Sequence, residues 1–206
     1  MVENATLEKI AEEVAQCGKC SLCKTRTNVV PGEGTENAEV FFVGEAPGRE
    51  EDSQGRPFCG QAGKFLDELL DEIGLKREEV FIGNVVKCRP PGNRDPLPEE
   101  IEACTHFLGA QIESIKPKLI VTLGRYSMNY FLPGLKISQD HGKAYRKNNQ
   151  VYFPVFHPAA ALYRNELRGM IINDFKKIPK VLGKIKKNEV KDISAENEDK
   201  QIDLGI

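Results

Sequence analysis

Apolar and polar residues follow one another along this chain in two recurring patterns, short apolar runs and longer amphipathic stretches. The apolar runs, rich in β-branched and aromatic residues, predict buried strands at 39–43, 80–86 and 118–123, with weaker β stretches near 143–147 and 150–155. Apolar residues at helical spacing predict helices at about 5–16, 61–74, 98–114 and 165–183, with a short helix after Gly124. Because strands alternate with helices, the pattern predicts an α/β fold in which a parallel sheet carries helices on both faces.

The segment after the first strand carries more chemical groups than a connection between two elements needs. It begins GEAPGREED at Gly44 and continues to GRPF, which ends at Phe58, and we expect no helix within it. Loops at the carboxyl ends of strands are where α/β proteins bind their ligands. Since the carboxyl ends of parallel strands lie at one edge of a sheet, we expect Glu45, Asn84 and His157 to share a pocket.

Composition places the chain among globular proteins with one folded domain. Its 206 residues contain no tryptophan, no long apolar run and no basic and then apolar region at the start, so we expect neither secretion nor insertion into a membrane. The net charge is −2, but the segment 188–206 alone carries −4 and leaves the rest mildly basic. We therefore expect a single domain at 1–187, with a charge compatible with DNA binding, and an acidic, disordered tail at 188–206.

Six cysteines stand in a chain without an export signal, and in a reducing compartment clustered cysteines more often bind metal or do redox work than form disulfides. Two form a C-x2-C at Cys17 and Cys20, and two follow much later at Cys88 and Cys104. Four thiolates that converge suit either a tetrahedral Zn²⁺ ion or a [4Fe–4S] cluster, and the spacing alone leaves both open. The two cysteines that we interpret as ordinary small side chains are Cys23 and Cys59.

Five features in this order, GEAPGREED, GRPF, GNVVKCRPPGNR, the four cysteines and HPAAAL, make the chain similar to the family 4, or iron–sulfur, uracil-DNA glycosylases. The resemblance runs from about Cys17 to Leu182, and it implies a three-layer α/β/α sandwich around a central four-stranded parallel sheet. It also implies a [4Fe–4S] cluster, which we expect on Cys17, Cys20, Cys88 and Cys104.

The activity that the resemblance implies is base excision repair by a monofunctional hydrolase. Such an enzyme flips uracil out of single- or double-stranded DNA, hydrolyses its N-glycosidic bond and leaves an abasic site. On this basis we expect a monomer without membrane contact, in the cytoplasm and, in a prokaryote, at the nucleoid.

The resemblance also assigns roles in a uracil pocket to residues of this chain. Phe58 matches the aromatic that stacks on the flipped base, and Asn84 matches the amide that pairs with O4 and N3–H of uracil. His157 matches the histidine whose N–H stabilises the negative charge that develops at O2 of the departing uracil. The loop whose backbone lines one edge of the uracil in this family corresponds here to Gly44, Glu45 and Ala46.

Activation of the water is the step at which the sequence departs from a better-known pattern. In family 1 the corresponding loop reads GQDPY and its aspartate orients the water, whereas this chain has Ala46 at that position, as is usual in family 4. We expect Glu45 or Glu51 to act in its place, with Asn93 as a water ligand.

Contacts with DNA outside the pocket are expected from basic and apolar side chains. Candidate phosphate contacts are Arg56, Lys87, Arg89, Arg94 and Arg164. A wedge that fills the gap left by the flipped base is expected around Leu162, Tyr163 and Arg164. Two alternatives stay open, a glycosylase of the same fold for another deaminated base such as hypoxanthine, and a DNA-binding module without catalysis.

Overall fold

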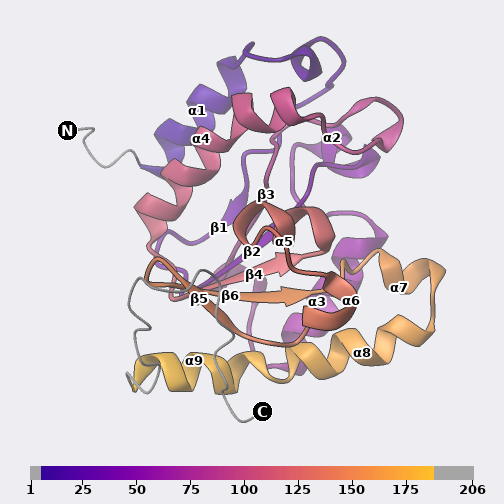
Figure 1. Ribbon diagram of the computed structural model, residues 1–206. Coiled ribbons are helices and arrows are strands. Elements are labelled where there is room, and N and C mark those ends of the chain that lie inside the picture. The colour runs from indigo at the N-terminus through magenta and orange to yellow at the C-terminus, as the bar shows by residue number, and fades with distance from the viewer. Residues whose placement is uncertain (1–5, 188–206) are drawn as a thin grey trace.

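The computed structural model describes residues 6–187, so the acidic tail expected at 188–206 lies outside the described residues. The described chain is built in three layers, with a sheet between two layers of helices (Figure 1). Its sheet has six strands in the order β1-β3-β2-β4-β6-β5. In chain order the strands are β1 Glu33–Gly34, β2 Val40–Gly44, β3 Phe81–Asn84, β4 Leu119–Leu123, β5 Tyr145–Lys147 and β6 Gln150–Val155.

The four inner strands form the parallel sheet that the resemblance implies. β2 lies parallel to both β3 and β4, and β4 lies parallel to β6. The expected α/β/α sandwich is therefore confirmed, with one difference, an antiparallel strand at each edge of the sheet. β1 is only two residues long and has no strand pattern in the sequence. β5 joins β6 through Asn148 and Asn149, whose positive φ angles of 49° and 64° suit a tight hairpin turn.

Helices cover both faces of the sheet. On one face α1 packs against α4, and on the other α3 packs against α8, with α9 following α8 (Figure 1). The helices are α1 Leu7–Gln16, α2 Arg49–Gln54, α3 Gln61–Glu72, α4 Pro98–Ile115, α5 Arg125–Phe131, α6 Ile137–Asp140, α7 Ala160–Tyr163, α8 Glu166–Phe175 and α9 Ile178–Lys186. Short 3₁₀ turns are η1 Ser21–Lys24, η2 Arg77–Glu79 and η3 Pro91–Asn93. Within residues 6–187 no helix is both long and apolar enough to cross a membrane.

The segment after β2 contains a helix, α2, where we expected an irregular loop. The carboxylate of Glu51 accepts a hydrogen bond from the N–H of Gly48 at 3.1 Å, which caps the start of α2. Gly55 ends the helix with a φ of 69°, a conformation that favours glycine. The expectation failed because α2 has no apolar stripe, so its caps define it and a hydrophobic pattern cannot reveal it.

The single helix expected at 165–183 is two helices, α8 and α9. Pro179 stands in the first turn of α9 and has no N–H to donate to the carbonyl of Phe175, so the hydrogen bonds of α8 cannot continue through it. Apolar residues keep their helical spacing across the break, which is why the pattern predicts one helix. The buried apolar residues of α8 and α9 are Leu167, Ile171, Phe175, Ile178, Val181 and Leu182.

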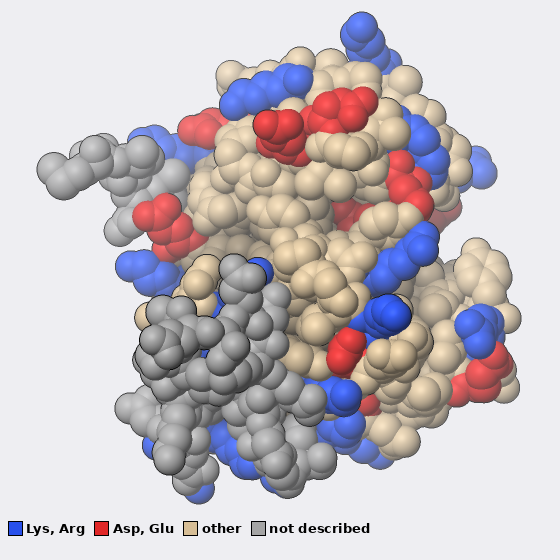
Figure 2. All heavy atoms as spheres, in the orientation of Figure 1, with Lys and Arg blue, Asp and Glu red and all other residues tan. Residues whose placement is uncertain are grey.

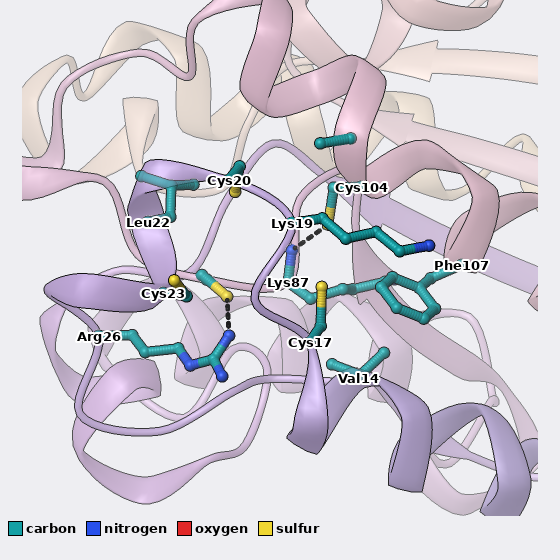
Figure 3. A pocket seen from close by; sticks show the side chains of 12 residues that line it. Val14, Cys17, Lys19, Cys20, Leu22, Cys23, Arg26, Lys87, Cys104 and Phe107 are labelled. Atoms are coloured by element: carbon teal, nitrogen blue, oxygen red, sulfur yellow. Dashed lines mark hydrogen bonds between the residues drawn. The ribbon is translucent and has the colours of Figure 1, made fainter.

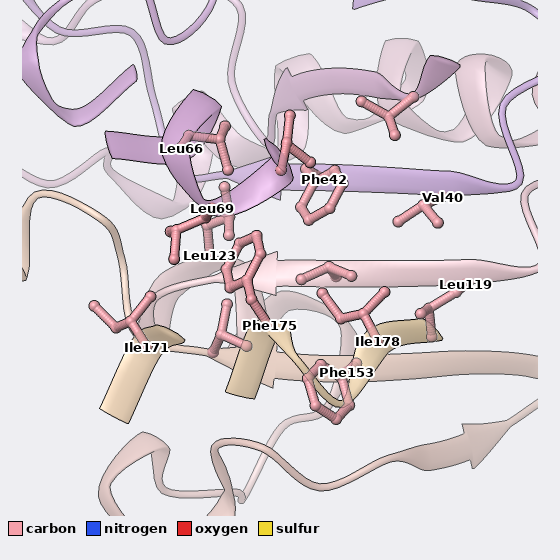
Figure 4. Close-up of a cluster of buried hydrophobic side chains, with 14 of the residues drawn as sticks. Val40, Phe42, Leu66, Leu69, Leu119, Leu123, Phe153, Ile171, Phe175 and Ile178 are labelled. Carbon is pink, nitrogen blue, oxygen red and sulfur yellow. The ribbon is translucent and has the colours of Figure 1, made fainter. Parts of the chain in front are cut away.

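Two hydrophobic clusters lie on opposite faces of the sheet, and β2 contributes side chains to both. Phe42 faces α3 and α8, and its ring stacks on that of Phe175 with 5.7 Å between the centroids (Figure 4). Phe41 belongs to the other cluster, beneath α1 and α4. Side chains of a strand alternate between faces, so Gly44 lies on the Phe42 side and Glu45, the next residue, on the Phe41 side.

Candidate active site

Two parallel strands end side by side, and the ends bring together the first two residues of the candidate site. Gly44 closes β2 directly opposite Asn84, which closes β3. A Cβ atom at Gly44 would stand 2.4 Å from Oδ1 of Asn84 and 2.9 Å from Cζ of Phe58. Since no other residue leaves this space open, glycine at position 44 allows the amide and the aromatic ring to meet at the edge of the sheet.

Phe58 reaches this point from the segment after α2. Its φ of 49° is unusual for a large side chain, and its carbonyl packs so closely on Gly63 that any Cβ there would overlap it. The ring is buried and stacks on the imidazole of His157, with 5.5 Å between the ring centroids. His157 in turn follows β6 and fits beside Gly124, which has a φ of 93° at the end of β4. We call Gly44, Phe58, Asn84 and His157 the Asn84 group.

Asn84 is almost completely buried, with 1% of its surface exposed. Its Oδ1 has no hydrogen-bond partner among the described residues. A buried acceptor without a partner costs about 1–3 kcal/mol, so an N–H donor from a bound molecule would be stabilised at this position. The carboxamide is therefore arranged to receive a ligand.

His157 is a neutral hydrogen-bond donor in this arrangement. The backbone N–H of Ala159 donates to Nδ1 of His157 at 3.1 Å, so Nδ1 acts as an acceptor and the ring proton is on Nε2. Burial lowers the pKa of His157 to about 4, because the charged ring would lose its hydration. At neutral pH the imidazole therefore offers an uncharged Nε2–H.

The Glu45 side chain leaves the sheet on the opposite face from Gly44. It lines a cavity of about 220 Å³ together with residues of α4 and α5 and their flanks. The other lining residues are Val85, Pro96, Ile101, Tyr126, Asn129 and Tyr130. Burial, and to a lesser degree the charge of Asp95, raise the pKa of Glu45 to about 7, against the opposite effect of Arg125. The backbone of Glu45 thus adjoins the Asn84 group while its carboxyl faces a separate cavity.

The other two expected water-activating residues hold structure within their own segments. Glu51 accepts hydrogen bonds from the N–H groups of Gly48 at 3.1 Å and Gly60 at 3.5 Å, and so ties both ends of the α2 segment together. Asn93, with a φ of 55°, accepts a hydrogen bond from Nε of Arg89 at 2.6 Å inside the η3 loop. Neither has a described hydrogen bond to the Asn84 group. Ala46 packs against the cluster beneath α1 and α4.

Five cysteines line one pocket, which we call the cysteine pocket (Figure 3). They are Cys17, Cys20, Cys23, Cys88 and Cys104. Figure 3 shows this pocket between the turn after α1 and the helix α4, with the side chains of Val14, Leu22 and Phe107 around the thiols. The thiols of residues 6–187 form no disulfide, and no group of three or more His, Cys, Asp or Glu side chains there is arranged to hold a metal ion.

Two donors point at sulfur atoms of the cysteine pocket. Nη1 of Arg26 donates to Sγ of Cys88 at 3.1 Å, and the backbone N–H of Lys87 donates to Sγ of Cys104 at 3.2 Å. Burial raises the pKa of Cys104 to about 11. The sequence interpretation missed that Cys23 faces this pocket, although its own C-x2-C spacing with Cys20 was the signal.

The prediction that Lys87 contacts a DNA phosphate was wrong. Its side chain is 1% exposed, and its Nζ donates to the backbone carbonyl of Asn84 at 2.9 Å and to Oε1 of Gln111 at 2.6 Å. The apolar neighbours Val85 and Val86 are the sequence signal that could have placed this lysine in the interior.

Most of the expected arginine contacts are engaged with carboxylates. Arg94 forms two hydrogen bonds to Glu100, at 2.9 and 2.7 Å, and Arg56 forms two to Glu33, both at 2.9 Å. Arg164 is exposed and pairs with Glu166. Leu162 and Tyr163, the apolar residues of the expected wedge, are 48% and 87% exposed.

Comparison with known proteins assigns the chain to a family. The model of the uracil DNA glycosylase superfamily matches residues 31–182. The type-4 uracil-DNA glycosylase of Sulfurisphaera tokodaii is 53% identical over 84% of this chain and 83% of its own length. The type-4 enzymes of Archaeoglobus fulgidus and Saccharolobus solfataricus are each 50% identical, over 87% and 85% of this chain and over 94% and 86% of their own lengths. The chain therefore belongs to the uracil-DNA glycosylase superfamily.

Proposed function

We propose that this chain is a uracil-DNA glycosylase that flips uracil out of DNA and hydrolyses its N-glycosidic bond, leaving an abasic site. The observation that carries the proposal is the Asn84 group, which joins a buried, unpaired amide oxygen, an aromatic ring and a neutral imidazole donor at one edge of the sheet. The type-4 names of relatives that are about 50% identical support the same activity.

Base recognition is assigned to Asn84. Its free Oδ1 accepts a hydrogen bond from N3–H of uracil, and its amide nitrogen donates to O4. Cytosine presents an acceptor and a donor at these two places, the reverse pattern, and would leave the buried amide oxygen without a donor. A ligand that leaves a buried polar group without a hydrogen-bond partner binds much more weakly than one that pairs with it, so this contact discriminates strongly between similar bases.

Flipping of the base is assigned to Phe58 and to the exposed wedge. The glycosidic carbon cannot be reached inside a stacked duplex, so uracil must leave the helix. The ring of Phe58 offers a face on which the flipped base stacks. Leu162 and Tyr163 extend from α7 into solvent, where an apolar side chain can fill the vacated place in the duplex.

Departure of the base is assisted by His157. When the bond between C1′ and N1 breaks, its electron pair moves to the uracil ring and gives O2 negative charge. The Nε2–H of His157 donates to O2 and stabilises this charge more strongly in the transition state than in the bound substrate. A neutral imidazole performs this step without first taking up a proton.

The water that attacks C1′ must give a proton to a base, and we propose Glu45 for this role. No described hydrogen bond engages the carboxylate of Glu45, whereas both oxygens of the Glu51 carboxylate accept from backbone N–H groups. With a pKa near 7, the carboxylate is poised to take up a proton at neutral pH. Its side chain must turn from the cavity toward C1′ when substrate binds.

We further propose that the cysteine pocket holds a [4Fe–4S] cluster on Cys17, Cys20, Cys88 and Cys104. Thiols from three chain segments line this one pocket, and two N–H groups donate to sulfur, which supports such a group. The described side chains are not already gathered as metal ligands, so the thiols must move together when the group binds. The group would supply a structural link between the turn after α1 and the 88–104 segment. Burial favours protonated thiols, so a bound cation must compensate when they ionise.

The metal in this pocket is tested on the purified protein by iron and sulfide analysis and by visible absorbance. A cluster gives a brown protein with about four iron atoms per chain. Cys88→Ser should abolish the colour, while Cys59→Ser, a cysteine outside the pocket, should leave it unchanged. Stoichiometric zinc in a colourless protein would instead establish the tetrahedral zinc site.

The proposed function is tested with a panel of oligonucleotides that each carry one uracil, hypoxanthine or thymine. Wild type should release uracil alone, and Asn84→Asp should lose preference for uracil because a carboxylate cannot donate to O4. The matched control is Asn37→Asp, which changes an exposed asparagine outside the Asn84 group. Release of hypoxanthine in place of uracil would favour the other deaminated base, and DNA binding without release of any base would favour a non-catalytic module.

A further inference from the structure

Lys87 is a buried lysine for which the proposed chemistry has no role. Its ammonium has two described acceptors, the carbonyl oxygen of Asn84 at 2.9 Å and Oε1 of Gln111 at 2.6 Å. No carboxylate is among these acceptors. A buried ammonium has lost its hydration, so it holds its acceptors in a narrow range of positions.

The same residue also contacts the cysteine pocket through its backbone. The N–H of Lys87 donates to Sγ of Cys104 at 3.2 Å, and Cys104 and Gln111 lie on the same helix, α4. The side chain of Gln111 donates onward to the carbonyl of Pro31 at 2.7 Å. Lys87 therefore joins the end of β3, the helix α4 and a cysteine sulfur in one set of contacts.

The contact with Asn84 falls at the point where β3 leaves the sheet. The next two backbone N–H groups, of Val85 and Val86, donate to the carbonyls of Gly44 at 3.0 Å and Glu45 at 3.1 Å. The carbonyl of Asn84 itself is held by the ammonium of Lys87. Rotation of this peptide would move the Cα–Cβ bond of Asn84, and with it the unpaired amide oxygen.

We propose that Lys87 is a positioning residue that sets the orientation of the Asn84 carboxamide for uracil and joins it to the cysteine pocket. The inference rests on the proposed function, because it explains how the base-reading amide is held. Lys87 does not touch the base and acts only through Asn84. A small displacement of a recognition group is costly, about a hundredfold for 1 Å, so loss of this contact should be measurable.

The test compares Lys87→Met, Asn84→Ala and the double variant in uracil excision, with Lys118→Met as the control for removal of an exposed lysine. Rates are expressed per cluster-bearing chain, and inhibition by free uracil is measured alongside. Lys87→Met should lower kcat/KM by about ten- to a hundredfold and weaken inhibition by free uracil by a similar factor. In the Asn84→Ala background the same change should have little further effect, because the residue through which it acts is already gone.

Each other outcome decides against the inference or against the proposed function. If wild type excises uracil and Lys87→Met does so equally well, the positioning role is wrong and the proposed function stands. Equal losses in both backgrounds would make Lys87 a general structural residue. Complete loss of metal in both Lys87→Met and Lys87→Gln would make it a support of the cysteine pocket alone. A wild type that neither excises nor binds uracil would overturn the proposed function and this inference together.

Discussion

Two glycines provide the space in which the candidate active-site side chains lie. A Cβ at Gly44 would overlap Asn84 and Phe58, and one at Gly124 would come within 3.0 Å of Cβ of His157. Close packing of this kind fixes the aromatic, the amide and the imidazole relative to one another before any ligand binds. Preorganised donors and acceptors of this type contribute most to transition-state stabilisation.

At this residue scale, His157 should be neutral and protonated on Nε2 across the physiological range. Burial lowers its pKa to about 4, and the Ala159 N–H occupies Nδ1. Nitrogen NMR of histidine-labelled protein at pH 6 should show one ring with a bare Nδ1 and a protonated Nε2, assigned by its absence in His157→Gln. The chain has only three histidines, which makes the assignment practicable. A His157 ring that titrates near its ordinary pKa would contradict this assignment.

Glu45→Gln should change both the stability and the activity in a manner that depends on pH. Because the pKa of Glu45 is raised to about 7, the folded state holds the proton more tightly than the unfolded chain. Its contribution to stability is therefore full below about pH 4.5 and is lost as pH rises through about 7. The variant should gain stability over wild type between pH 5 and pH 8, as measured by thermal unfolding.

The activity of the same variant addresses the proposed role in water activation. The kcat/KM of wild type should rise with pH through about 7, whereas Glu45→Gln should be slower and lack this rise. Glu50→Gln, an exposed neighbour, is the control for both measurements. An unchanged pH profile in Glu45→Gln would show that another group accepts the proton.

Much of the site at the residue scale follows from the sequence. Asn84 and His157 stand at the ends of apolar strands, and parallel strands bring such ends together. The same pattern grouped the Glu45 side chain with them, but its carboxyl lines a separate cavity because neighbouring residues of a strand face opposite sides of the sheet. The sequence does not predict the conformation of Phe58, because its positive φ depends on packing against Gly63. The buried position of Lys87 was missed because a lysine is normally exposed, although its apolar neighbours Val85 and Val86 were a signal.

At the scale of elements, caps and turns set the positions that hydrophobic patterns leave undefined. Glu100 in the first turn of α4 is 0% exposed and accepts hydrogen bonds from Arg94, from the N–H of Leu97 and from the hydroxyl of Ser21. It thereby ties α4, the loop before it and η1 together. Residues of η1 and α4 also line the cysteine pocket.

Glu100→Gln should destabilise the protein, because hydrogen bonds to charged groups each contribute about 1.5–3 kcal/mol. Hydrogen bonding with Arg94 is the main cause that lowers the pKa of Glu100 to about 2. Its stabilisation is thus present above about pH 4.5 and lost as pH falls toward 2. Urea unfolding should show a deficit for Glu100→Gln at pH 7 that shrinks at pH 3.

The neighbouring Glu99→Gln provides the comparison, since Glu99 is exposed on the same turn. Equal stability of the two variants at pH 7 would show that the Glu100 contacts add nothing.

Helices with an apolar stripe, such as α3 and α4, were predicted from the sequence close to their observed bounds. α2 and the break between α8 and α9 were not, because caps and a proline define them.

At the scale of the whole molecule, the sheet separates two tasks on its two faces. The Asn84 group lies at the carboxyl ends of the parallel strands, next to the cluster beneath α3 and α8. The cysteine pocket lies on the other face, under α1 and α4. The layered arrangement was predictable from alternating strands and helices. The two edge strands were harder to predict in their pairing, because neither has more than three residues.

Basic side chains are not confined to one region of the face in Figure 2. On the face in Figure 2, Lys and Arg mix with Asp and Glu over the upper part and gather along the lower edge, over α8 and α9. Lys186 of α9 pairs with Glu39 at 2.7 Å, and Glu39 precedes β2, at the end of the strand opposite Gly44. Lys186 therefore lies at the opposite end of the parallel strands from the Asn84 group.

The central claim, that the Asn84 group excises uracil, is tested most directly by single-turnover kinetics on an oligonucleotide with one uracil. Wild type, His157→Ala and His106→Ala, an exposed histidine away from the group, are compared at saturating enzyme with alkali to break abasic sites. Wild type and His106→Ala should cleave at similar rates, and His157→Ala should be slower by at least about a hundredfold, the effect of one lost transition-state donor. Equal rates for all three proteins, or no uracil-dependent cleavage by wild type, would contradict the account.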